Sequence, residues 1–242
     1  TLQNNGSAIP GDISSVVAGT GLSGGGTSGD VTLNVEAAQS GITSLGTLTA
    51  LTVNGNLSVD GGTIKLDGNY PTGSNNVAMG DNALNSVASD GNSNTIIGNN
   101  AGTAITTGDL NVGIGAGALL ETTTASNNTA VGGIALCANT TGTCNVAVGA
   151  CALLNNTTAD DNTAVGMNAL CLNTTGCRNT TIGHNSMDVN TTGDFNTALG
   201  RSSLSGNTTA DNNTAVGYHS MLANTTGAQN VALGACALNA NT

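Results

Sequence analysis

Aliphatic and polar positions follow one fixed period through the last two thirds of the chain. The phrase Asn-x-x-aliphatic-Gly occurs first at residues 76–80 and last at residues 230–234. After one step of 18 residues its asparagine returns every 17 residues, at positions 94, 111, 128, 145, 162, 179, 196, 213 and 230. A constant period of this length is typical of stacked repeats, in which each unit buries its apolar face against its neighbours.

Numbering each repeat from its asparagine, as positions 1 to 17, shows which positions are constant. Position 4 is always aliphatic or Met, position 5 is always Gly, and position 9 is Leu or Met in every coil except the one that has Gly102. We expect positions 4 and 9 to form the core and the glycine to supply a restricted backbone at a corner. The repeat is best represented by Asn128, Val131, Gly132, Asn145, Val148, Gly149, Asn162, Val165 and Gly166.

The remaining positions predict the shape of a coil. Position 3 is usually Ala and has the opposite parity to position 4, so in a strand it points away from the predicted core, where a ladder of Ala would suit a neighbouring subunit. Positions 12 to 15 are Asn-Thr-Thr-Gly or Asn-Thr-Thr-Ala, which favours a turn with stacked asparagines that bond from coil to coil. We therefore predict an all-β, parallel β-solenoid with two strands and two turns per coil, extending about 45 Å over ten coils.

The chain before the repeats has a different composition and a different spacing of aliphatic residues. Residues 1–40 contain short β-favouring runs separated by Gly and Ser, which indicates strand, turn and strand. Residues 41–75 place Val, Ile and Leu two to five residues apart between turn signals such as Asn54-Gly55. Such short strands bury too little surface alone, so an intertwined shaft of three chains is expected there, followed by the joint at Tyr70-Pro71. Residues 76–242 form the roll of about ten coils.

Composition narrows the range of functions. The chain has three aromatic residues, no Trp, three Lys and Arg against fourteen acids, and a net charge of −11. Nothing in it neutralises a run of phosphates or an anionic membrane surface, so neither nucleic acid nor membrane insertion is expected. No stretch is long and apolar enough to span a bilayer. Because Thr242 falls at position 13 of a coil with no capping segment after it, we expect that the chain is part of a longer one.

Two resemblances extend over nearly the whole chain. The phrase Asn128-Thr129-Ala130-Val131-Gly132, followed by Ala135-Leu136, resembles the head repeats of trimeric autotransporter adhesins. This resemblance implies a left-handed β-roll packed as a homotrimer, although the coils here are longer. The runs at residues 16–22, 30–35 and 48–59 look like segments common in tail fibres of bacteriophages, especially marine and cyanobacterial ones. They imply a virion protein that contacts itself, other virion proteins and, through regions outside this chain, a host surface receptor.

Six cysteines leave two interpretations open. Cys137 with Cys144, and Cys171 with Cys177, flank the turn of their own coils, so each pair predicts an intracoil disulfide if the Cα atoms approach to about 5.5 Å. The other interpretation is free thiols that act as small apolar fillers in a reducing compartment. Zinc is disfavoured because no Cys-x-x-Cys pair or convergent His is present.

Other candidate sites have simpler explanations. A metal on a trimer axis could use His184 and His219, but surface imidazoles explain them better. Asp160, Asp161 and Asp211 lie in predicted turns without the spacing of calcium loops, so solvated carboxylates are expected. A phosphate cradle at residues 19–26 lacks a following Lys and helix. The recurring Asn-x-Thr triplets, as at residues 139–141, match a glycosylation acceptor, yet a structural turn explains them.

The same composition argues against catalysis. Paired carboxylates and sugar-stacking aromatics are lacking, and no Ser-His-Asp or Cys-His arrangement is present. We therefore expect no enzyme activity and no cofactor. The preferred hypothesis is a rigid trimeric spacer in a phage tail fibre that supports attachment to the host. The head of a bacterial cell-surface adhesin is one alternative, and an ice-binding solenoid that uses the stacked Thr pairs at positions 13 and 14 is another.

Overall fold

The computed structural model describes residues 16–17, 22–26, 33–35 and 73–240. The chain divides into two compact units between Thr63 and Ile64, and each is described by itself. The shaft predicted at residues 41–75 lies, except for its last three residues, outside the described part, so it stays a prediction.

The first unit contains a small antiparallel sheet, as the sequence predicts for residues 1–40. Its strands are β1 (Val16–Val17), β2 (Leu22–Gly26) and β3 (Leu33–Val35), in the order β1-β2-β3. Val16 lies opposite Gly26, and Leu22 lies opposite Val35. The last three glycines of the candidate phosphate cradle are thus part of β2.

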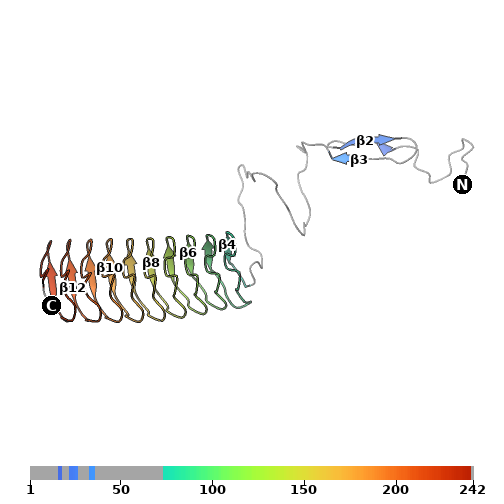
Figure 1. Ribbon diagram of the computed structural model, residues 1–242. Helices are drawn as coiled ribbons and strands as arrows, with labels where there is room; N and C mark the ends of the chain where they lie inside the picture. Colours follow the sequence, from blue (N-terminus) through green and yellow to red (C-terminus); the bar gives the residue numbers. More distant parts are fainter. Residues whose placement is uncertain (1–15, 18–21, 27–32, 36–72, 241–242) are drawn as a thin grey trace, which may run out of the picture. The chain divides into compact units, whose positions relative to one another are not determined.

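The repeats form a parallel β-solenoid of about nine turns with coils of about 17 residues, and the described residues contain no helix. Each coil contributes one three-residue strand to a ten-stranded parallel sheet in the order β13 to β4. Figure 1 shows these strands side by side and pointing the same way. They are β4 (Val77–Met79), β5 (Thr95–Ile97), β6 (Val112–Ile114), β7 (Thr129–Val131), β8 (Val146–Val148), β9 (Thr163–Val165), β10 (Thr180–Ile182), β11 (Thr197–Leu199), β12 (Thr214–Val216) and β13 (Val231–Leu233).

The prediction of two strands per coil is wrong, because the rest of each coil is made of turns. Positions 7, 9 and 17 have positive φ, as at Cys151 (59°), Leu153 (50°) and Asp161 (61°), which is incompatible with an extended strand. The turns still pair from coil to coil. The Leu153 amide donates to the Ala169 carbonyl at 3.0 Å, and the Cys151 amide donates to the Gly133 carbonyl at 3.1 Å. Stacking is therefore continuous around the coil without a second sheet.

The core is formed by positions 3, 8 and 9, so the prediction for positions 3 and 4 was reversed. Ala147 and Ala164 at position 3 are fully buried, whereas Val148 and Val165 at position 4 are only partly buried. Position 9 is confirmed, since Leu136, Leu153 and Leu170 are fully buried. A coil this small encloses a narrow interior, which one Leu and small side chains fill, so the bulkier position 4 points outward.

One coil lacks a large residue at position 9 and has a large residue at position 3 instead, which fills the interior. Gly102 replaces the usual Leu at position 9, and Ile96 replaces the usual Ala at position 3 of the same coil. Ile96 and Ile105 are fully buried, and a Cβ placed on Gly102 would lie 2.9 Å from the Ile105 Cδ1 atom. The exchange keeps the volume of the interior roughly constant, as a close-packed core requires.

The expectation for position 5 is confirmed. Its glycines have φ between 123° and 142°, a conformation that side chains disfavour. Successive coils also approach closely at these glycines, because a Cβ on Gly132 would lie 2.5 Å from the Gly149 carbonyl oxygen. Glycine at this position is therefore required twice, by the backbone conformation and by the coil spacing.

Candidate functional site: ladders inside the solenoid and its outer faces

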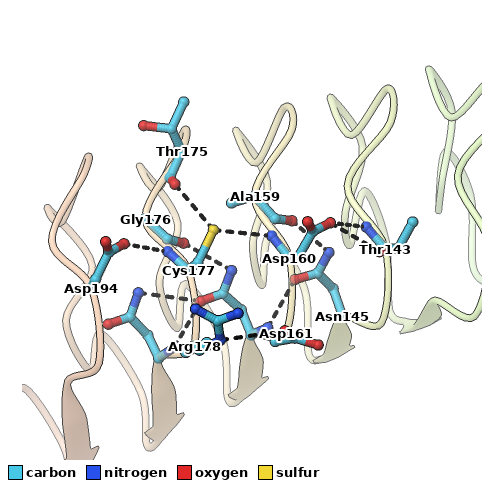
Figure 2. Close-up of polar contacts among 12 residues, drawn as sticks. Thr143, Asn145, Ala159, Asp160, Asp161, Thr175, Gly176, Cys177, Arg178 and Asp194 are labelled. Atoms are coloured by element: carbon cyan, nitrogen blue, oxygen red, sulfur yellow. Dashed lines mark hydrogen bonds and ion pairs between the residues drawn. The ribbon is translucent and has the colours of Figure 1, made fainter.

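The asparagines at position 1 form a buried ladder along the solenoid. Asn145 Oδ1 accepts the Asn162 amide at 3.0 Å, and the Asn145 amide donates to Asn128 Oδ1 at 2.9 Å. Figure 2 shows that the side-chain amide of Asn145 also points to the Ala159 carbonyl, to which Nδ2 donates at 2.8 Å. Each asparagine thus binds its neighbouring coils and closes its own coil.

A second ladder at position 12 meets the first at a shared acceptor. Asn156 Nδ2 donates to Asn139 Oδ1 at 2.9 Å, as expected from the sequence, and to the Ala159 carbonyl at 3.0 Å. The Ala159 carbonyl therefore accepts from both Asn145 and Asn156. The sequence marks position 1 by its invariance, but its role as the partner of position 12 is visible only in the folded coil.

The Asn-x-Thr triplets that begin at position 12 belong to this second ladder. Asn139 is fully buried and its Nδ2 donates to the Gly142 carbonyl at 2.9 Å. The interpretation of the triplet as a structural turn fits this geometry, since the nitrogen that a glycan would need is engaged inside the coil.

The two threonines of each turn have different surroundings. At position 13, Thr157 Oγ1 donates to the Thr174 carbonyl at 3.0 Å, and the same bond recurs along the solenoid. At position 14, Thr158 and Thr175 are exposed. The ice-binding hypothesis relied on both threonines, and the hydroxyl at position 13 is already used within the protein.

Position 16 carries a ladder of half-buried acceptors that the sequence interpretation missed. Asp160 Oδ1 accepts the Thr143 amide at 2.6 Å, and Asp194 Oδ1 accepts the Cys177 amide at 2.7 Å. Asp211 does the same for the Asp194 amide at 2.7 Å. The expectation of solvated turn carboxylates is therefore wrong for Asp160 and Asp211. The recurrence of Asp at position 16 was the available signal.

Cys177 replaces an aspartate in this ladder. Figure 2 shows its sulfur between two coils, where Sγ accepts the Asp160 amide at 3.4 Å and donates to the Thr175 carbonyl at 3.4 Å. Beside it, Asp161 is exposed and pairs with Arg178, with Oδ2 and Nε 3.6 Å apart.

All six cysteines are free thiols in the structure, so neither Cys137–Cys144 nor Cys171–Cys177 is bonded. The thiol of Cys177 is instead directed into the position 16 ladder. Burial raises the pKa of Cys137, with a further contribution from Glu121. Burial also raises the pKa of Cys171, followed by the effects of Cys151 and Asp188.

These environments predict a fixed order of thiol reactivity. Only the thiolate is alkylated readily, and a raised pKa lowers its fraction at any pH below that pKa. With iodoacetamide at pH 8, we expect Cys137 and Cys171 to be modified more slowly than the exposed Cys144 and Cys236. Peptide mass spectrometry over time measures the order, and the difference should shrink in denaturant. Equal rates in the native protein would contradict these environments.

The two histidines lie two coils apart. His184 and His219 are half-buried at positions 6 and 7, and the ring of His219 stacks on Tyr218 with centroids 3.8 Å apart and planes inclined by 16°. Within residues 73–240 and the three short strands, no three His, Cys, Asp or Glu side chains converge as metal ligands would. The described part of the chain has no helix that could cross a membrane.

The outer face of the ten-stranded sheet is formed by positions 2 and 4. Position 2 is Thr or Val throughout, and position 4 is Val, Ile, Leu or Met, so the face carries no charge over ten coils. The side chains at position 4 are partly exposed, as for Ile114 at 39% and Ile182 at 45%. An uncharged, regular face of this length on a chain of net charge −11 is the strongest candidate for an interaction surface.

The Ala ladder predicted as a subunit contact is inside the coil, so it cannot serve that purpose. The residues next to the sheet face along the coil are position 17 on one side and position 6 on the other. Both hold small or polar residues in most coils and larger ones in the coils from Met167 to Tyr218.

Comparisons of this chain with family models, with curated proteins and with solved structures found no match. The assignment of the repeats to a parallel β-solenoid therefore depends on the coil geometry itself.

Proposed function

We propose that this protein is a structural component of a bacteriophage tail fibre, in which it acts as a rigid trimeric spacer that supports attachment to the host. Its partners are two further copies of itself, other virion proteins and a host receptor bound through regions outside this chain. The left-handed roll is the part of the proposal that derives from the resemblance to adhesin heads. The intertwined shaft at residues 41–75 follows from the short strands predicted there, which bury too little surface in a single chain. The proposed localisation is the virion.

Continuous bonding from coil to coil supports the role of a spacer. Backbone pairing runs through the strands and the turns, and buried ladders at positions 1 and 12 add side-chain bonds at nearly every coil. Bending such a rod would open many bonds at once, in an interior where each unsatisfied polar group costs about 1–3 kcal/mol. A rod of this kind transmits position over its length and needs no catalytic group.

The uncharged sheet face supports association with identical copies. The side chains at positions 2 and 4 recur once per coil, so a partner that matches them along ten coils must have the same repeat. A second copy of this chain has that repeat. Because both contacting faces would be uncharged, the contact also avoids the electrostatic repulsion expected between two chains of net charge −11.

The trimer is tested by placing charge on this face. The wild-type particle should have a mass of about 70 kDa, which is three times the chain mass of 23.3 kDa. The double substitution Val148→Glu and Val165→Glu should give monomers, because burying unpaired carboxylates is costly. Circular dichroism should be unchanged, since both side chains are partly exposed in one chain.

Thr158→Glu with Thr175→Glu is the matched control, because it adds the same charge to exposed positions of the same two coils. Sedimentation equilibrium should still give the trimer mass for this variant. A monomeric wild type, or loss of the trimer in the control alone, would refute association through the sheet face.

The assignment to a virion is tested by localisation. A gold-labelled antibody against residues 76–242 should decorate the tail fibres of virions that carry this gene. Labelling of the surface of uninfected bacteria would instead favour the adhesin head. Thermal hysteresis of the purified protein would favour the ice-binding alternative.

A further inference from the structure

A second surface feature interrupts the repeat at position 6. Three successive coils carry His184, Arg201 and Tyr218 there, and His219 follows at position 7. We call these four residues the Arg201 patch. In the other coils position 6 holds Asp81, Asn99, Ala116, Gly133, Ala150, Met167 or Ala235. The strand register is the same beside the small residues as beside the larger ones, so the fold does not require the larger side chains.

Arg201 is exposed and carries an uncompensated charge. In the described part of the chain no carboxylate forms an ion pair with it, whereas Arg178, the other described cation, pairs with Asp161 at 3.6 Å. In a chain with three cations and fourteen acids, a cation left unpaired makes a local site for an anion.

This cation lies over one ring of a stacked aromatic pair. The Arg201 Cζ atom lies 5.8 Å from the centre of the Tyr218 ring, and the His219 ring stacks on the same ring at 3.8 Å. Tyr218 remains 45% exposed. A guanidinium that an aromatic contact restricts loses less entropy on binding, and its planar donors match a carboxylate or a phosphate through two parallel hydrogen bonds.

We propose that the Arg201 patch binds an acidic saccharide, with Arg201 contacting its carboxylate or phosphate and Tyr218 and the imidazoles contacting its sugar rings and hydroxyls. The patch extends over three coils, about 10 Å at the spacing of paired strands, which a short saccharide spans. Two further features favour a saccharide over a protein partner. The patch is small, and polar Asn168 and Asn185 border it, joined by an Nδ2 to Oδ1 bond of 3.1 Å. This inference gives the solenoid a binding role of its own beyond the spacer function and does not depend on the trimer.

The test measures binding of the full chain to three immobilised polysaccharide probes by surface plasmon resonance. Polygalacturonate carries carboxylates, a delipidated lipopolysaccharide core carries phosphates, and dextran carries neither. Binding to one or both acidic probes but not to dextran is expected, and which of the two binds identifies the charged group. Equal binding to dextran, or no binding to any probe, would overturn the proposal.

Substitutions then assign the binding to the patch. Arg201→Ala should weaken binding at least about tenfold, the usual effect of losing hydrogen bonds to a charged group. Arg178→Ala is the matched control, since Arg178 also lies near an aromatic ring, 5.3 Å from the centre of Phe195, but is paired with Asp161. It should bind within about twofold of wild type.

Mass measurement of the same variants separates this proposal from the proposed function. If Arg201→Ala keeps the affinity for the acidic probes but loses the trimer, Arg201 is a subunit contact and the saccharide site is refuted. If the wild type is monomeric and still binds through Arg201, the trimeric fibre is refuted and the saccharide site stands.

Discussion

Gly132→Ala is expected to lower the free energy of unfolding by about 3 kcal/mol or more. The new Cβ would lie 2.5 Å from the Gly149 carbonyl oxygen of the next coil, and the backbone would have to hold a side chain at φ 139°. Neither problem is relieved by a side-chain movement, because the atom that is met belongs to the backbone. The coils on either side must separate, so the damage falls on the interface between coils rather than on one residue.

Its neighbour Gly133 supplies the control within the same turn. A Cβ on Gly133 meets nothing within 4 Å, so Gly133→Ala should change stability by about 0.5 kcal/mol at most, and a slight gain is expected from the reduced freedom of the unfolded chain. Thermal unfolding followed by circular dichroism compares the two variants. Hydrogen exchange should show lost protection in β7 and β8 for Gly132→Ala only. Equal melting temperatures would mean that the coils are not stacked as described.

The sequence predicted the repeat, its glycine corner and the core residue at position 9, but it placed position 4 in the core instead of position 3. The period and the invariant Gly are visible because every coil repeats the same steric demand, as at Gly132 and Gly149. Which of Ala147 and Val148 faces inward is not visible, because strand parity gives two faces without saying which is the interior. From the sequence we expect the larger residue, Val148, inside. In the structure Ala147 is inside, because the space left beside Leu153 is small. That space is defined only once the turns have closed the coil.

Among the candidate sites, too, features set by the repeat itself could be predicted, whereas features set by other contacts between coils could not. The position 12 ladder was predictable because identical asparagines in identical turns must stack. The role of Asp160 was missed because its amide donor, Thr143, lies a full coil earlier in the chain. For Cys177 the sequence leaves a disulfide with Cys171 and a free thiol both open, whereas its surroundings in the ladder are those of an aspartate. The Arg201 patch is not apparent from the sequence, because its three members at position 6 are 17 residues apart.

Asn145→Ala is expected to destabilise the solenoid by about 3 kcal/mol, although it removes only three heavy atoms. The Asn162 amide loses its acceptor inside the protein, where water does not replace it, and the Ala159 carbonyl keeps only the bond from Asn156. Asn155→Ala, ten residues later in the same coil, is the control. Its side chain is partly exposed and makes no hydrogen bond among the described residues, so a change within about 0.5 kcal/mol is expected. Urea unfolding of both variants gives the two values. A similar loss of stability in both variants would indicate that the position 1 ladder does not join the coils. A large loss for Asn145→Ala alone would show that the invariant asparagine is needed as the acceptor for the backbone amide of the following coil.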